Sequence, residues 1–358
     1  MAIEPYLRAL VEITGSDLHL KAGAVPRIRL DGTLRPLRTP ALSATDTERM
    51  LSEILRPDLA DEFAATGEAD FALMIDGIGR FRVNAFRQRG NVGIVLRRVS
   101  IGAIPLTELG LPEPVSALSL QPRGLVLVTG PTGAGKTTTL AGMIDEINRH
   151  RDVHVVTIED PIEIIHYDNR ALINQREVRI DTADFKVAMR SAMRQDPDVI
   201  LIGEMRDTET VHAALSAAET GHLVLSTLHT VDAQETVTRV IDFFPPHEQQ
   251  QIRLSLAGAL RGILCQRLVP RADNQGRCVA MEICINTGRV ADAISDKAKT
   301  GTLTSLIADG RFYGMQTFDQ HLVALYRDQM ITLDEAMASS TSPHDLEVEL
   351  RRLGLVAS

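Results

Sequence analysis

A glycine-rich segment that ends in a lysine and a threonine is the part of the chain best suited to chemistry. It reads Gly130-Pro131-Thr132-Gly133-Ala134-Gly135-Lys136-Thr137-Thr138 and matches the pattern G-x-x-x-x-G-K-[ST]. Glycines leave no Cβ between the backbone amides and a phosphate, and they adopt backbone angles closed to other residues. Lys136 would contact the β- and γ-phosphates, and the Thr137 hydroxyl would ligate Mg²⁺. We therefore expect residues 130–138 to bind ATP or GTP together with Mg²⁺.

The elements on either side of this loop are those that a phosphate site requires. Residues 125–128 form a short apolar run, which predicts a buried parallel strand, and residues 138 to about 148 have a helical pattern. Strand, loop and helix in this order would point the loop amides and the helix N-terminus at the same anion. The alternative, a glycine-rich turn that matches by chance, does not explain this context.

Acidic side chains follow two further predicted strands. Residues 152–158 lead into Glu159-Asp160-Pro161-Ile162-Glu163, and residues 199–202 lead into Gly203-Glu204. Ligand-facing groups collect at the carboxyl ends of strands in open α/β sheets. The first group could handle Mg²⁺ and water, although a turn or helix cap around Pro161 remains an alternative. Glu204 resembles a Walker B acid in which glycine takes the place of the usual Asp, and it could contact metal through water or position the attacking water.

Two further pairs of residues are candidates for sensing or stabilising phosphate. His222 and His229 bracket a third predicted strand, which suggests a γ-phosphate sensor, with structural hydrogen bonding as the alternative. Arg80 and Arg82 alternate with apolar residues and must share one face of a strand. That face could be a solvated surface or a phosphate-facing one, and the spacing does not decide between them.

Composition limits the class of protein. The 358 residues carry 38 basic and 47 acidic side chains, a net charge of −9, which disfavours a generic nucleic-acid binder. Cys265, Cys278 and Cys284 form no C-x-x-C pair, so we expect neither a zinc site nor a disulfide framework. The N-terminus lacks the apolar core of a secretory signal, and no apolar stretch has the length of a membrane span. We therefore expect a cytoplasmic protein.

The pattern of elements predicts two domains. Residues 1–98 alternate helical and strand-like segments, including a tight turn at Asp31-Gly32, as in an α+β domain with an antiparallel sheet. Residues 99–122 contain four prolines and suggest a linker. From residue 123 to 358, strands and helices alternate at first, which indicates a mostly parallel sheet covered by helices, and the C-terminal part is helical.

The ordered set of motifs resembles the secretion-type ATPase superfamily, and most closely the type IV pilus retraction ATPases, the PilT-like proteins. The resemblance rests on residues 15–20, 79–84, 130–137, 157–163 (Asp box), 194–207 (Walker B), 220–230 (His box) and 314–320. It implies an N-terminal PAS-like domain followed by a RecA-like P-loop ATPase domain. It also implies a ring-shaped homo-hexamer with ATP and Mg²⁺ between subunits.

The resemblance also assigns roles to residues and names partners. Glu163 would be the general base, Glu204 the acid at Mg²⁺, and His222 and His229 the γ-phosphate sensors. Arg80 and Arg82 would reach a nucleotide across domains. The ring would dock on an inner-membrane platform protein at the inner face of the plasma membrane, act on the pilin machinery indirectly, and drive pilus retraction and twitching motility.

One segment departs from the resemblance. Retraction ATPases often carry Ala-Ile-Arg-Asn-Leu-Ile-Arg-Glu-Gly, whereas residues 302–310 read Thr-Leu-Thr-Ser-Leu-Ile-Ala-Asp-Gly and lack both arginines. This leaves an accessory paralogue of the retraction motor as an alternative. Another secretion-type ATPase is a second alternative, although pilus-extension and type II secretion ATPases usually insert a tetracysteine zinc element that this chain lacks.

Overall fold

The computed structural model describes residues 1–30 and 32–356, and the chain forms two compact units. The N-terminal unit comprises Met1–Ile101 together with Glu163–Ile165, and the C-terminal unit comprises Gly102–Ile162 together with His166–Ser358. Asp31, one half of the turn predicted at Asp31-Gly32, and residues 357–358 of the second predicted domain lie outside the described residues. Each unit is described by itself below.

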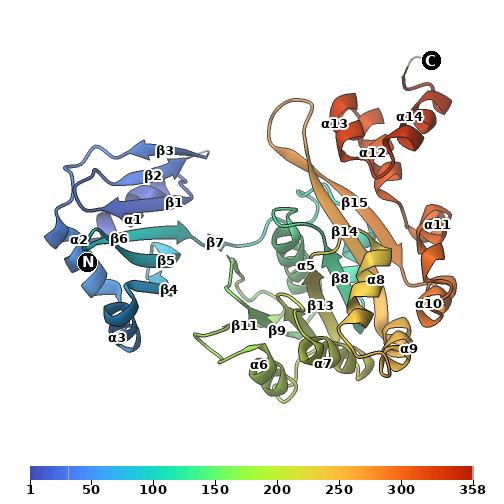
Figure 1. Ribbon diagram of the computed structural model, residues 1–358, viewed down its shortest axis with the longest axis horizontal. Coiled ribbons are helices and arrows are strands. Elements are labelled where there is room, and N and C mark those ends of the chain that lie inside the picture. The colour runs from blue at the N-terminus through green and yellow to red at the C-terminus, as the bar shows by residue number, and fades with distance from the viewer. Residues whose placement is uncertain (31, 357–358) are drawn as a thin grey trace. The chain divides into compact units, whose positions relative to one another are not determined.

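The N-terminal unit is a six-stranded antiparallel sheet with helices on its apolar face (Figure 1). The strand order is β3-β2-β1-β6-β5-β4, and side chains that alternate along the strands, such as Leu18, Phe81 and Leu96, are fully buried. They share one hydrophobic cluster with residues of α1 and α2. The elements are α1 (Glu4–Glu12), β1 (Asp17–Lys21), β2 (Arg27–Leu30), β3 (Thr33–Pro36), α2 (Ala44–Ile54), α3 (Pro57–Thr66), β4 (Glu68–Ile75), β5 (Gly79–Gln88) and β6 (Asn91–Arg98).

The C-terminal unit is built on a seven-stranded sheet in the order β11-β9-β12-β13-β8-β14-β15. All neighbours are parallel except β14 and β15. The central strands are buried along their whole length, so β8 and β12 read in the sequence as apolar runs, whereas β13 includes the buried polar residues Ser226 and Thr227. The strands are β8 (Gly124–Thr129), β9 (His154–Glu159), β11 (Leu172–Glu177), β12 (Val199–Ile202), β13 (Leu223–Leu228), β14 (Leu260–Pro270) and β15 (Arg277–Ile285).

Helices cover both faces of this sheet. Along β8, Leu125 and Leu127 belong to one hydrophobic cluster and Val126 and Val128 to another, because successive side chains point to opposite faces. The first cluster includes α6 (Phe185–Ala192), α7 (Thr208–Glu219), α8 (Ala233–Asp242) and α9 (Gln249–Ala259), and the second includes α4 (Pro114–Ser119) and α5 (Lys136–His150). This arrangement confirms the predicted α/β fold class.

The C-terminal part of the chain is helical, as expected. It contains α10 (Gly288–Ser295), α11 (Leu303–Ala308), α12 (Phe318–Arg327), α13 (Leu333–Ser339) and α14 (Pro343–Arg352), with short 3-10 turns at Thr300–Thr302 and Arg311–Tyr313. Buried residues of these helices, among them Ile294, Phe318 and Leu350, extend the first cluster of the C-terminal unit.

The proline-rich segment 99–122 contains more structure than a free linker would. It begins with β7 (Ser100–Ile101), which pairs with β10 (Ile164–Ile165), and it includes α4. Leu106, Val115 and Leu118 are buried in the second cluster of the C-terminal unit. Most of the segment therefore packs on that unit, because its apolar side chains have a face of α5 to cover.

Candidate active site

The glycine-rich loop joins the buried end of β8 to the start of α5. Gly130, Gly133 and Gly135 all have positive φ angles, 143°, 80° and 87°, which side chains with a Cβ rarely adopt. A Cβ on Gly130 would also clash with the backbone carbonyl of Gln266 on the adjacent strand. Gly135 is the N-cap of α5, so the helix N-terminus opens directly onto the loop. Strand, loop and helix N-terminus thus follow one another in the order that an anion site requires.

Gln266 on β14 holds this loop in place. Its side chain is fully buried, and its Nε2 donates a hydrogen bond of 2.6 Å to the carbonyl oxygen of Ala134. This role of Gln266 was not predicted from the sequence. The available signal was a polar side chain directly after the apolar run 262–265, but the spacing alone does not say that it faces the loop.

Lys136 is folded back onto the loop that carries it. Its Nζ donates to the carbonyl oxygens of Gly130 at 2.6 Å and Pro131 at 3.1 Å, and it lies 3.5 Å from Nδ1 of His229. Burial lowers the pKa of Lys136, and the negative charge of Glu204 opposes that shift. The ammonium group is therefore held beside the loop by acceptors that a phosphate could replace.

Glu204 and His229 lie together at the same edge of the sheet. His229 Nε2 is 3.2 Å from the Glu204 carboxylate, so His229 bridges Lys136 and Glu204. The two residues follow β12 and β13, whose carboxyl ends meet beside the loop because both strands run parallel to β8. The structure thus brings together three of the predicted site residues from three segments of the chain.

Arg206 connects this group to the end of β9. Its Nε lies 2.8 Å from the Glu204 carboxylate, and its Nη1 lies 4.0 Å from that of Asp160. Arg206 lies within the predicted Walker B segment, residues 194–207, but no role was predicted for it. Its guanidinium joins two carboxylates that follow different strands, and this would hold the Glu204 side chain in one orientation.

The acids predicted at the end of β9 separate in the structure. Glu159 accepts hydrogen bonds from Thr157 at 2.7 Å and Gln175 at 3.2 Å, within the sheet. Glu163 belongs to the N-terminal unit, where its carboxylate lies 3.8 Å from Nη1 of Arg82. The predicted role of Glu163 as the general base stays a prediction.

The two predicted histidine sensors occupy opposite ends of β13. His229 follows the carboxyl end of the strand, whereas His222 precedes Leu223, which pairs with Gly124 at the start of β8. A strand of this length separates the two by roughly 20 Å. His222 instead lies 2.9 Å from the Ala217 carbonyl through its Nδ1. His222 therefore does not join Lys136, Glu204 and His229 within this chain, and its predicted role as a γ-phosphate sensor stays a prediction.

Arg80 and Arg82 share one face of β5, as the alternation predicts. Phe81, which lies between the two arginines, and Val83, which follows Arg82, are fully buried on the other face. On the neighbouring strand β6, the residue directly opposite Arg82 is Arg97. The Nε of Arg97 lies 2.8 Å from the buried carboxylate of Asp17. This hydrogen bond raises the pKa of Arg97, as do the nearby negative charges. The face is therefore strongly basic and has one buried acid to neutralise part of it.

The residues around the loop fit a magnesium–nucleotide complex. Thr137 is an exposed residue of the first turn of α5, Thr138 follows it, and Glu204 has a side chain that is 20% exposed. Hydroxyl and carboxylate oxygens are the hard ligands that Mg²⁺ prefers. Thr137 and Glu204 would hold the ion, as the sequence analysis expects.

Comparison with known proteins decides the family. The family model described as type II/IV secretion system protein matches residues 2–335. The chain belongs to this family. It is 42% identical to the type IV pilus ATPase PilU of Pseudomonas aeruginosa, in a match that covers 98% of this chain and 92% of PilU. It is 43% identical to the retraction ATPase PilT of the same organism, in a match that covers 92% of this chain and 95% of PilT.

A solved structure of a family member agrees. The crystal structure of the pilus retraction motor PilT with bound ADP has a TM-score of 0.89 and 42% identity, and the match covers 97% of this chain and 99% of that one. The prediction of a PilT-like ATPase of this family is confirmed. No helix within residues 1–30 and 32–356 combines the length and the apolar character that crossing a bilayer requires.

Proposed function

We propose that the chain is an ATP-hydrolysing motor that drives type IV pilus retraction. The observation that carries the proposal is the contact series Lys136–His229–Glu204 beside a glycine-rich loop, in a chain that aligns with PilT and PilU over almost its whole length. The relatives' names support retraction, and they also fit an accessory paralogue, since the identities to PilU and PilT are nearly equal.

Each side chain near the loop has a task that its position suits. The loop amides, the N-terminus of α5 and Lys136 would bind the phosphates. Mg²⁺ held by Thr137 and Glu204 would neutralise charge on the β- and γ-phosphates. His229 touches both Lys136 and Glu204, so it can respond to the presence of the γ-phosphate. Glu163 is our candidate for the base that activates water.

The arginines of β5 would complete the site from another copy of the chain. Arg80 and Arg82 lie on the basic face of the N-terminal sheet, and we infer a homo-hexamer in which this face meets a nucleotide bound by a neighbour. A positive charge supplied in this way can be worth about 10³–10⁵ in rate for phosphoryl transfer. Hydrolysis would then depend on the placement of the N-terminal unit, which is how chemistry could be coupled to movement.

Hydrolysis itself is the first test. Purified wild-type protein should release phosphate from ATP only with Mg²⁺, and the variants Glu204→Gln and Lys136→Ala should lose at least about 100-fold in kcat/KM. Glu209→Gln is the matched control, because Glu209 pairs with Lys186 on the surface of α6 and α7 rather than with the loop. Equal turnover by the wild type and Glu204→Gln would end the proposal.

Mixing two inactive variants tests the arginines. Rings assembled from Lys136→Ala and Arg82→Ala subunits would contain some interfaces with an intact lysine and an intact arginine, so activity should reappear. Arg87→Ala is the control on the same strand, since Arg87 pairs with Glu48 at 2.8 Å. If no mixture regains activity, Arg82 does not act across subunits.

Direction and location are tested in cells. Deleting the gene should leave cells hyperpiliated and without twitching motility, whereas bald cells would contradict retraction.

We also propose that the ring binds an inner-membrane platform protein and so lies at the inner face of the plasma membrane. Expression in Pseudomonas aeruginosa strains lacking either PilT or PilU separates the two motor roles by which strain recovers twitching.

A further inference from the structure

A buried carboxylate in the C-terminal unit has no part in the reaction described so far. Glu282 lies on β15 and is only 5% exposed. Its Oε1 accepts a hydrogen bond of 2.9 Å from the backbone N–H of Ala233, the first residue of α8. The three residues between His229 and Ala233 form the loop that leads into this helix. Glu282 therefore fixes the end of the segment that carries His229.

The start of helix α8 has two further carboxylate acceptors. Asp232 is already its N-cap and accepts from the N–H of Glu235 at 2.7 Å. The Glu235 side chain in turn accepts from the N–H of Val231 at 2.8 Å. These two carboxylates satisfy the N–H groups of Glu235 and Val231, whereas the buried N–H of Ala233 has Glu282 as its acceptor. A third acid, supplied from a core strand, calls for another explanation.

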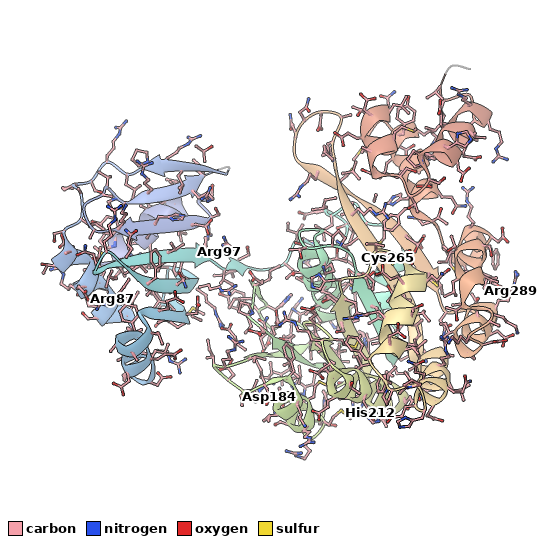
Figure 2. All side chains as sticks on the ribbon, in the orientation of Figure 1. Arg87, Arg97, Asp184, His212, Cys265 and Arg289 are labelled. Carbon is pink, nitrogen blue, oxygen red and sulfur yellow. The ribbon has the colours of Figure 1, made fainter. Side chains whose placement is uncertain are left out.

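Glu282 is also aligned with the strand that carries the phosphate loop. In the sheet, Glu282 is directly opposite Cys265 on β14, and Cys265 is directly opposite Thr129 on β8. Thr129 immediately precedes Gly130. Cys265, which Figure 2 labels, is the middle residue of this row by the strand register. The row links the phosphate loop, through two neighbouring strands, to the segment that bears His229.

We propose that Glu282 is a positioning residue for ATP hydrolysis, because its buried carboxylate holds the His229 loop against β14 and β15 and so keeps His229 in contact with Lys136 and Glu204. This inference rests on the proposed function, since it assumes that those contacts matter for turnover. Glu282 itself touches none of the reacting groups, and it acts through the Ala233 N–H.

The charge of Glu282 makes the arrangement sensitive to pH. Burial raises the pKa of Glu282 to about 7, as does the charge of Asp232, while the Ala233 N–H and Arg267 oppose the shift. The two cysteines near it stay neutral at that pH, because burial raises the pKa of Cys265 well above its usual value and that of Cys284 to about 12. An ionised carboxylate is a stronger acceptor for the Ala233 N–H than a protonated one.

The first experiment compares hydrolysis at pH 8 and pH 6 in the wild type and in Glu282→Gln. The ratio of their kcat values should be about ten at pH 8 and approach one at pH 6, since a carboxylate of pKa about 7 is largely ionised at the first pH and largely protonated at the second. KM and the affinity for a fluorescent ADP analogue should change less than twofold. Taking this ratio cancels the effects of pH that are common to both proteins.

A control and a second variant separate positioning from general damage. Asp184→Asn removes the carboxylate cap of α6, which accepts from Val187 at 2.7 Å, and it should leave kcat and its pH dependence unchanged. Ala233→Pro removes the donor rather than the acceptor at a helix position where proline is tolerated, and Asp232 before it is already extended. It should lower kcat as Glu282→Gln does.

Hydrogen exchange gives a readout that needs no turnover. The amides of residues 229–236 should exchange faster in Glu282→Gln than in the wild type, while those of α6 should not change. If the wild type had no ATPase activity, the proposed function would be refuted, but the exchange rates would still test whether Glu282 holds the His229 loop. Unchanged exchange, or a Glu282→Gln or Ala233→Pro protein with wild-type kcat at pH 8, would overturn the inference.

Discussion

Replacing Glu282 by glutamine should stabilise the C-terminal unit, and the gain should depend on pH. Burial favours the protonated carboxyl, so its pKa is about 7 in the folded chain against a reference value of 4.5. The unfolded chain therefore releases this proton at lower pH than the folded chain does. Stability contributed by the proton is fully present below pH 4.5 and is lost as the pH rises to 7. A difference of about 2.5 units corresponds to about 3 kcal/mol.

Urea unfolding at pH 4.5 and pH 8, followed by circular dichroism because the chain has no tryptophan, measures this effect. The free energy of unfolding of Glu282→Gln, minus that of the wild type, should be about 3 kcal/mol larger at pH 8 than at pH 4.5. Any constant cost of the amide group cancels in this comparison. Glu235→Gln, an exposed carboxylate of α8, is the control and should show no such change. A difference that is equal at both pH values, or larger at pH 4.5, would refute the reasoning.

Three further substitutions test other parts of the structure. His321 accepts from the Met281 N–H at 2.9 Å and burial lowers its pKa to about 4, so the free energy of unfolding of the wild type, minus that of His321→Gln, should fall by about 2 kcal/mol between pH 7 and pH 5; urea titrations in which this difference stays constant would contradict this. Gly130→Ala should weaken binding of a fluorescent ADP analogue at least tenfold, because the new methyl group meets the Gln266 carbonyl, and unchanged affinity would show that the loop can yield. Ser43→Ala should remove the capping box of α2 and destabilise the N-terminal unit by about 1 kcal/mol without altering ATPase activity; a change in kcat would mean that α2 does more than support its sheet.

The parts of the molecule that could be predicted from the sequence are those whose physics is local. The phosphate loop needs glycines at fixed positions between a strand and a helix, and all of those residues are adjacent in the chain. Continuous apolar runs indicate strands that are buried on both faces, as β8 and β12 are. Alternation of Arg80 and Arg82 with apolar residues placed both arginines on one face of β5 for the same reason.

The parts that could not be predicted depend on pairings between distant segments. Gln266 meets Ala134 across 132 positions, and Glu282 meets Ala233 across 49. Nothing near either residue marks it as different from other polar residues in a strand. Glu163 is adjacent to β10, whose partner β7 lies more than sixty residues earlier. From its position in the sequence, Glu163 was grouped with the acids that follow β9. The pairing of β10 with β7 instead brings Glu163 beside Arg82.

His222 is a different case, because the information was available. The two histidines flank one strand, and a parallel strand brings only its carboxyl end to the nucleotide edge of the sheet. Sequence similarity to the His box favoured both residues, but strand length separates them by roughly 20 Å. The predicted role of His222 as a γ-phosphate sensor stays a prediction.

The energetics of Glu282 argue that it is kept for more than packing. A glutamine at this position would retain an oxygen acceptor for the Ala233 N–H and would avoid the cost of about 3 kcal/mol that an ionised, buried carboxylate adds at neutral pH. Asp232 already caps the helix, so stability alone favours the amide. If Glu282 served packing alone, a substitution there should lower kcat only to the extent that it lowers the free energy of unfolding. If Glu282 positions His229, one substitution should instead make the protein more stable at pH 8 and slower at the same pH, and this opposite movement of two measured quantities is the result that a packing role does not produce.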